Sequence, residues 1–156
     1  MSFRIKGLPA EHFNHLFALS HEELAKHGGV RRIADDRRPG YPCRISLTDS
    51  QPGDELLLLN YEHLAVDGPY QSRYAIYVRE NARDAELAVS EIPPLLYDRL
   101  LSVRAFSAAG TLLDADVATG AQLAPTIERL LAPSEVAYLH LHNARPGCYA
   151  ARVDRA

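Results

Sequence analysis

Four consecutive leucines, Leu56–Leu59, lie near the middle of the chain and run on into Asn60 and Tyr61. Because neighbouring side chains of a strand point to opposite faces, a strand over Leu56–Tyr61 is apolar on both faces. This pattern predicts a strand in the centre of a sheet, covered on both sides. The remainder of the chain must therefore supply strands that pair with it.

Several other segments show the alternation or the β-branched content of strands. They are Phe3–Ile5, Cys43–Leu47, Tyr74–Val78, Val103–Phe106, Leu112–Val117, Val136–Asn143 and Tyr149–Val153. In the segment Cys43–Leu47 we expect the side chains of residues 43, 45 and 47 on one buried face. Short turns at Pro52-Gly53 and Ala109-Gly110 separate successive strands, and this spacing favours antiparallel pairing.

Helical patterns are fewer and short. Phe13, Leu16 and Phe17 form an apolar stripe, and Ser20 followed by Glu23 is a capping-box pattern that predicts a new helical start. Gly28-Gly29 should end that helix. Two further helices are predicted, over residues 93–100 and over residues 123–131. The sequence thus predicts an α+β fold in a single globular domain over residues 1–156, mainly an antiparallel β-sheet with three or four helices packed on one face.

Composition narrows the function classes. The chain has 156 residues, 47% of them hydrophobic, and a net charge of −3, which argues against a nucleic-acid partner. Its longest apolar run is far shorter than the ~20 residues of a membrane helix, so no membrane partner is expected. The first residues show no leader pattern, and two cysteines are too few for a disulfide scaffold. We therefore expect a cytoplasmic protein with reduced thiols, whose oligomeric state the sequence leaves open.

The H-x-H motif His140-Leu141-His142 is the main metal-site signal. On a strand, both histidines share a face with Tyr138, whereas the intervening leucines point to the core. The histidines then face solvent, a cleft or a second layer. Two imidazoles can share a metal ion, but a catalytic zinc usually has three protein ligands. A third ligand could come from Cys43, Glu62, His63 or Cys148, so a metal ion stays an alternative, and no metal ligand or cofactor is assigned.

The two cysteines are candidates for a reactive thiol. Cys43 precedes Arg44 and Cys148 follows Arg145, and a nearby cation favours the nucleophilic thiolate. If the last two strands form a hairpin, Cys148 lies near His142 in a Cys–His pair. The alternatives are two buried cysteines without reactivity, or a redox pair, which needs Cα atoms within ~7 Å.

The polar cluster Asn60–His63 follows the leucine run, and Arg79 follows the next predicted strand. These segments give candidate anion-binding and polar contacts beside the thiols. The candidate catalytic residues are Cys43, His63, His142 and Cys148. The candidate ligand-binding residues are Arg44, Asn60, Tyr61, Glu62, Arg79, His140, Asn143 and Arg145.

Three blocks carry a resemblance to a known family. They are Gly40–Arg44, Leu58–His63 and His142–Ala150, and they resemble the signature blocks of a bacterial family known only as a domain of unknown function. The likeness extends from Phe3 to Arg155. It implies a bacterial single-domain protein, and it brings no activity, cofactor or catalytic residue.

Two classes of function stay open. The first is a small enzyme with one cleft lined by Cys, His and Arg, acting on a small polar or anionic ligand. The second is a non-catalytic module that binds a small ligand or a protein through the same surface. Convergence of Cys43, His63, His142 and Cys148 on one pocket would favour the enzyme hypothesis, whereas their placement on separate faces or in an apolar core without polar partners would argue against it.

Overall fold

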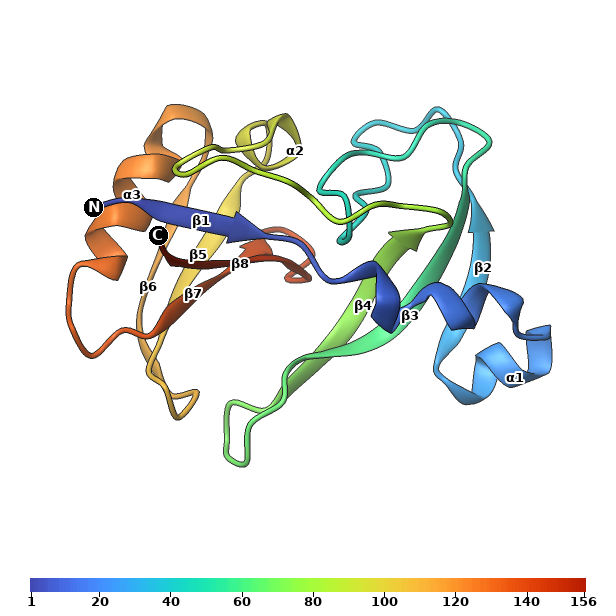
Figure 1. The fold of residues 1–156 in the computed structure, drawn as a ribbon, viewed down its shortest axis with the longest axis horizontal. Coiled ribbons are helices and arrows are strands. Elements are labelled where there is room, and N and C mark those ends of the chain that lie inside the picture. The colour runs from blue at the N-terminus through green and yellow to red at the C-terminus, as the bar shows by residue number, and fades with distance from the viewer.

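The computed structural model describes all residues, 1–156, and contains two antiparallel sheets (Figure 1). The five-stranded sheet has the order β1-β8-β7-β5-β6, and the three-stranded sheet has the order β2-β3-β4. The strands of the first are β1 (Phe3–Lys6), β5 (Leu101–Phe106), β6 (Leu112–Ala118), β7 (Tyr138–Asn143) and β8 (Tyr149–Arg155). Those of the second are β2 (Gly29–Ile33), β3 (Glu55–Leu64) and β4 (Ser72–Arg79).

Most of the predicted strands and both predicted hairpins are confirmed. The leucine run lies in β3, the central strand of its sheet, as its two apolar faces require. Strands β5 and β6 form one antiparallel hairpin, and β7 and β8 form the other. The second hairpin turns at Gly147, whose φ of 84° is a left-handed conformation that favours glycine.

Two helices cover one face of the five-stranded sheet. They are α2 (Pro94–Tyr97) and α3 (Leu123–Leu131). Helix α3 turns its apolar side to the sheet, so that Leu123, Ile127 and Leu130 join the main core. The opposite face of this sheet is directed towards the three-stranded sheet. The fold class is α+β, as predicted, although the strands form two sheets.

Helix α1 (His21–Lys26) begins where the capping box predicts. The Ser20 hydroxyl accepts a hydrogen bond from the Glu23 backbone N–H, and the Glu23 carboxylate accepts one from the Ser20 N–H. The predicted helix before it is replaced by two 3₁₀ turns, η1 (Ala10–His12) and η2 (Asn14–Ala18). The Arg31 guanidinium donates to the Phe17 and Leu19 carbonyls, which satisfies backbone groups that a continuous helix would have paired.

Around the three-stranded sheet, one predicted strand is wrong and one observed strand was not predicted. Residues 43–47 form a tight turn, closed by the Leu47 N–H donating to the Cys43 carbonyl, and not a strand. Their apolar side chains divide between two cores, because Ile45 packs beside β3 and Leu47 packs beside β5. Strand β2 was not predicted, because Gly28-Gly29 was interpreted only as a helix stop. Gly28 does end α1, but Gly29 already pairs with Leu59 of β3.

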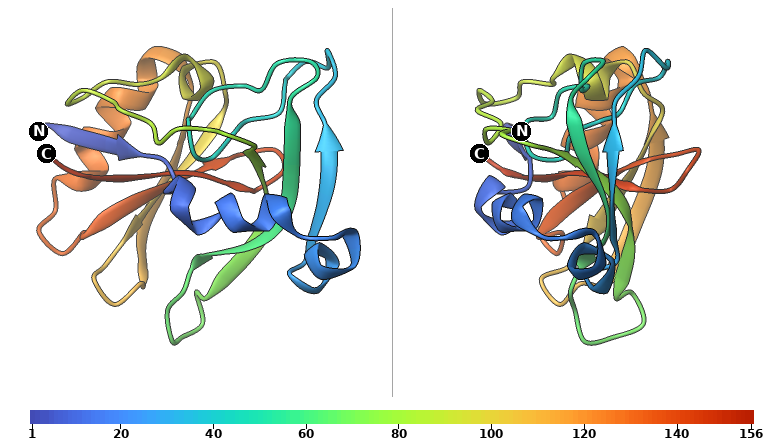
Figure 2. Two further views of the ribbon diagram at one scale, coloured as in Figure 1. Left: turned by 45° about the vertical axis from the view of Figure 1, so that its right-hand side comes forward. Right: turned by 90° about the vertical axis from the view of Figure 1, so that its right-hand side faces the viewer.

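The long loop 34–54 connects β2 to β3 and extends towards the five-stranded sheet, so that it contacts both sheets (Figure 2). Its Arg44 N–H donates to the Tyr77 carbonyl of β4, and its Arg44 side chain reaches the Tyr149 carbonyl of β8. The loop therefore holds residues from both sheets at fixed positions. None of the helices has the length and apolar character needed to cross a membrane.

Candidate functional site

A hollow of about 690 Å³ lies where loop 34–54, both sheets and the β7–β8 turn meet. This volume is in the usual range for small-molecule sites. We call it the junction pocket. It is lined by Pro39, Gly40, Pro42, Arg44, Leu58, Tyr74, Ala75, Tyr77, Asp98, Arg99, Leu100, Thr119, Asn143, Ala144, Arg145, Pro146 and Cys148.

Arg44 forms the floor of the junction pocket and is only 2% exposed. Its Nε donates to the Tyr149 carbonyl at 2.8 Å, and its Nη1 donates to the Pro42 carbonyl at 2.7 Å. Its Nη2 donates to Cys148 Sγ at 3.1 Å. The guanidinium has no carboxylate partner. Burial lowers its pKa, and Cys148 is the neighbour that most strongly opposes this effect.

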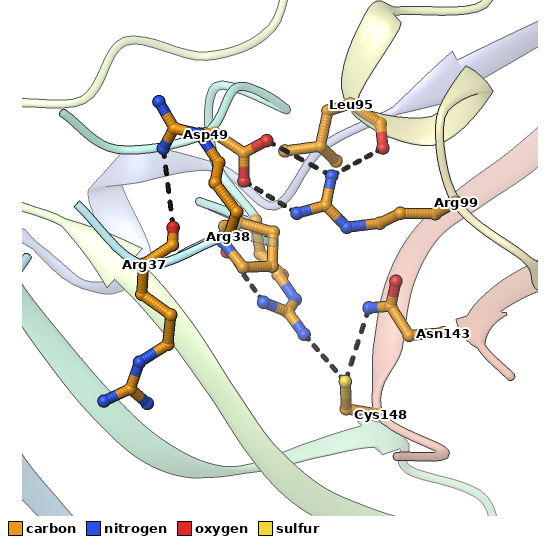
Figure 3. Close-up of polar contacts among 9 residues, drawn as sticks. Arg37, Arg38, Asp49, Leu95, Arg99, Asn143 and Cys148 are labelled. Atoms are coloured by element: carbon orange, nitrogen blue, oxygen red, sulfur yellow. Dashed lines mark hydrogen bonds and ion pairs between the residues drawn. The ribbon is translucent and has the colours of Figure 1, made fainter. Parts of the chain in front are cut away.

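Cys148 receives hydrogen bonds from two buried side chains (Figure 3). Besides Arg44, the Asn143 side-chain amide donates to Sγ at 3.3 Å. Because both partners are donors and one is charged, they stabilise negative charge on the sulfur. Cys148 itself is half-buried and lines the pocket, so the sulfur lies beside space that a small molecule can occupy. This arrangement suits a nucleophilic thiol.

Arg99 is a second arginine fixed at the pocket wall. Its Nη1 and Nη2 both donate to the Asp49 carboxylate, and its Nη1 also donates to the Leu95 carbonyl (Figure 3). A two-point arginine–carboxylate pair fixes both position and orientation. It ties loop 34–54 to the segment after α2.

The charges that line the junction pocket are mainly positive. Arg44, Arg99 and Arg145 line it beside one acidic residue, Asp98, and the charge of Arg99 is paired with the Asp49 carboxylate. Arg145 is exposed at the β7–β8 turn, without an ion pair to a carboxylate. Apolar and aromatic side chains make up much of the remaining wall. Arg44 and Arg145, which have no carboxylate partner, therefore outnumber Asp98 in the lining, although the whole chain carries a net charge of −3.

The predicted histidines form a separate cluster between the sheets. The His63 ring lies 4.9 Å from that of His142 and 6.2 Å from that of His140, measured between centroids, and it stacks on Tyr149 at 5.5 Å. The two histidines of β7 occupy one face, as predicted, and this face meets the second layer. Burial lowers the pKa of both His140 and His142 to about 3, and it also lowers the pKa of His63.

The histidine cluster is not arranged as a metal centre. Nowhere in the structure do three or more His, Cys, Asp or Glu side chains gather in a way that could hold a metal ion. His142 Nδ1 is hydrogen-bonded to the Gly147 carbonyl at 2.9 Å. The Nδ1 atoms of His63 and His140 are buried without a hydrogen-bond partner.

The expected convergence of both cysteines and the histidines on one cleft is not found. Cys43 is fully buried in an apolar cluster, where its Sγ accepts only the Arg79 backbone N–H at 3.4 Å. Cys148 does lie in the hairpin with His142, but its sulfur accepts hydrogen bonds from Arg44 and Asn143 instead. Alternation along β7 explains this, because His142 and Asn143 point to opposite faces. Both cysteines are free thiols.

The other candidates near β3 and β4 lie outside the junction pocket. Asn60 Oδ1 accepts a hydrogen bond from Arg73 at 2.8 Å, and Glu62 accepts one from Gln71 at 2.7 Å. Tyr61 packs against the Phe13 ring at 5.7 Å. Arg79 lies 3.8 Å from the Asp54 carboxylate. These contacts support the three-stranded sheet and its turns.

Four of the predicted residues therefore meet at the junction pocket, namely Arg44, Asn143, Arg145 and Cys148. Arg99 and Asp49 are not among the residues predicted from the sequence. Their segments gave no motif, and only the three-dimensional fold brings the two residues together. A general excess of arginine over lysine in the sequence was the one available signal.

Comparison with known proteins places the chain in a family. A family model described as a protein of unknown function, DUF1203, matches residues 40–155. The chain belongs to the DUF1203 family. The match omits the first 39 residues, so it is shorter than the resemblance suggested, but it includes every lining residue of the junction pocket except Pro39. No curated protein and no solved structure matches this DUF1203 chain.

Proposed function

We propose that the junction pocket binds a small anionic molecule and presents Cys148 to it as a nucleophile. The observation that carries this proposal is the hydrogen bond from the buried Arg44 guanidinium to Cys148 Sγ at 3.1 Å. A buried arginine usually pairs with a carboxylate. Arg44 instead directs its charge at a thiol, and anionic sulfur is the form that attacks electrophiles.

The anionic character of the ligand follows from the pocket walls. Arg145 is exposed without an ion pair, and the two other arginines are held in fixed orientations by hydrogen bonds. Carboxylates and phosphates match the planar donor pattern of arginine. The aromatic and proline side chains add apolar surface for the rest of the ligand. We also infer a cytoplasmic location, because a reducing compartment keeps both thiols free.

A second function is favoured by a specific observation. No histidine, aspartate or glutamate is hydrogen-bonded to Cys148 Sγ, whose two partners are Arg44 and Asn143. A thiol that no general base or acid contacts suits the binding of an anion without its transformation. The alternative is therefore a non-catalytic binding module with the same ligand class.

Protection of Cys148 from alkylation tests the proposal. The reduced protein is treated with the uncharged reagent iodoacetamide at neutral pH, and the modification of Cys148 is followed by peptide mass spectrometry. Benzoate and benzamide have the same shape but differ in charge, and chloride keeps the ionic strength equal. We expect benzoate to slow the alkylation of Cys148, with a weaker effect in Arg145→Gln, whereas benzamide has little effect.

The outcomes separate the two functions. Fast alkylation with protection by benzoate supports a nucleophilic site that accepts anions. Slow alkylation with protection by benzoate supports the binding module. Equal effects of benzoate and benzamide would overturn the anionic ligand in both.

A further inference from the structure

We infer that the electrophile for Cys148 is the disulfide of a small anionic thiol, with which the protein forms a mixed disulfide. This inference rests on the proposed function and specifies the substrate class of the same site. Three features of the junction pocket carry it: the direction of the donors, the hydrogen-bond partners of the sulfur, and the position of Arg145.

The donors are aimed at the sulfur itself. Arg44 Nη2 and Asn143 Nδ2 lie 3.1 and 3.3 Å from Cys148 Sγ. Attack on a carbonyl instead develops charge on an oxygen, which needs donors directed at a neighbouring position. In thiol–disulfide exchange the negative charge stays on the sulfur atoms throughout. Donors on Sγ therefore stabilise the anion that attacks and the anion that leaves in the reverse step.

The hydrogen-bond partners of the sulfur restrict the leaving group. Neither Arg44 nor Asn143 can give up a proton at neutral pH, so neither group on the sulfur can protonate an amine or alkoxide as it leaves. A thiol can leave as a stable thiolate. The pocket chemistry thus favours an electrophile whose leaving group needs no proton.

The exchange step is balanced without any further reactant. The Cys148 thiolate attacks one sulfur of the disulfide, a bond forms between Sγ and that sulfur, and the original S–S bond breaks. The second thiol leaves with the electron pair as its thiolate. The disulfide is the oxidant and Cys148 is oxidised. Cys43 is fully buried and makes no hydrogen bond to Cys148 Sγ, so an external thiol must reverse the reaction.

Arg145 provides the preference for an anionic thiol. It lies two residues before Gly147 in the turn that carries Cys148, and it is exposed at the pocket rim. A carboxylate on the bound half of the disulfide can pair with it. Cationic disulfides meet the same arginine with like charge.

The test compares three disulfides of different charge. Reduced protein is mixed with oxidised glutathione, which is anionic, with cystamine, which is cationic, or with uncharged 2-hydroxyethyl disulfide. Intact-mass spectrometry follows the adduct, and each rate is divided by that of the neutral thiol N-acetylcysteinamide. We expect the normalised rate with oxidised glutathione to exceed that with cystamine by about tenfold, the size of one charge-assisted contact.

Three variants give the controls. Cys148→Ser should form no adduct. Arg145→Gln should reduce the preference for oxidised glutathione over cystamine severalfold. Arg83 is exposed and makes no side-chain hydrogen bond or ion pair, so Arg83→Gln should keep the wild-type preference.

Equal normalised rates for the three disulfides, or an adduct on Cys43, would overturn the inference. If Cys148 still reacts with iodoacetamide faster than the reference thiol, the proposed nucleophilic site stands and only its substrate class is wrong. If both reactions are slow, the nucleophilic site fails as well.

Discussion

Arg44 donates a hydrogen bond to Cys148 Sγ although the two residues lie 104 positions apart in the chain. The contact joins loop 34–54 to the β7–β8 hairpin across the junction of the two sheets. The same arginine also holds the backbone carbonyls of Pro42 and Tyr149. One side chain therefore links the shape of the pocket to the environment of its thiol.

Replacing Arg44 tests this link. Arg44→Gln leaves the buried Tyr149 carbonyl and the partly buried Pro42 carbonyl without their donor, so we expect the free energy of unfolding to fall by about 2–4 kcal/mol. Urea denaturation measures the change. In buffer without urea, where the variant is folded, the alkylation of Cys148 by iodoacetamide should also be slower than in the wild type. Cys148→Ser is the matched control, because it keeps an acceptor for Arg44 and should change the stability by less than about 1 kcal/mol. An Arg44→Gln variant as stable as the wild type would contradict the account.

The pair of Arg99 and Asp49 should matter more for the binding of an anion in the pocket than for the free energy of unfolding. The Asp49 side chain is 38% exposed, so solvent screens the interaction, and we expect Asp49→Asn to cost about 1 kcal/mol. The loss of the two-point contact frees the orientation of Arg99 and should weaken protection by benzoate. A double-mutant cycle with Arg99→Gln checks the pairing. Additive effects of the two substitutions would show that the residues act independently.

The histidine cluster predicts a loss of stability in acid. The pKa of His140 is lowered from 6.5 to about 3, chiefly by burial and in addition by the charges of His142, His63, Arg152 and Arg104. Between these two pKa values the unfolded chain binds a proton that the folded chain does not. The free energy of unfolding therefore falls as the pH falls through this window, by about 1.4 kcal/mol per pH unit for each such histidine.

His140→Phe isolates this effect in urea denaturation at several pH values. The ring of His140 packs against Phe106 at 5.3 Å and has an unpartnered Nδ1, so a phenyl ring should be tolerated at neutral pH. The variant should lose stability less steeply in acid. Phe106→Leu disturbs the same contact without removing a titratable group, so its acid slope should match the wild type. Equal slopes for His140→Phe and the wild type would refute the role of this histidine.

Gly7 lies outside the pocket lining, but its lack of a side chain allows the close approach of the turn that carries Arg44. A Cβ atom at this position would lie 2.3 Å from the Ile45 carbonyl oxygen and 2.9 Å from that of Arg44. Gly7→Ala must therefore displace the turn that carries Arg44. We expect a loss of about 2 kcal/mol or more, together with slower alkylation of Cys148. At Gly68 a Cβ atom would meet nothing within 4 Å, so Gly68→Ala is the control and should have little effect. Identical behaviour of the two variants would show that the close approach does not matter.

The parts of the fold that depend on local pattern could be predicted from the sequence. The central position of the leucine run followed from its two apolar faces, and the start of α1 followed from Ser20 and Glu23. The segment 43–47 was misjudged because its alternation of apolar residues serves two different cores. Strand β2 has little pattern of its own, and its pairing with Leu56–Leu59 determines its conformation.

The site could be predicted only in part for a related reason. The chemistry of Cys148, Arg44, Asn143 and Arg145 was recognisable from residue type and from position next to turns. Their partners were not, because Arg44 and Cys148 meet through tertiary structure alone. The predicted Cys–His pair does not form because successive side chains of β7 point to opposite faces, so that Asn143, and not His142, lies beside Cys148.

The rate of alkylation of Cys148 tests the central claim most directly. Iodoacetamide is added to the reduced wild-type protein at neutral pH, and peptide mass spectrometry gives separate rates for Cys148 and Cys43. If Arg44 and Asn143 stabilise the anionic sulfur, Cys148 reacts about tenfold faster than N-acetylcysteinamide, and Cys43 stays unmodified in the folded protein. A rate for Cys148 equal to or below that of the reference thiol would contradict the account.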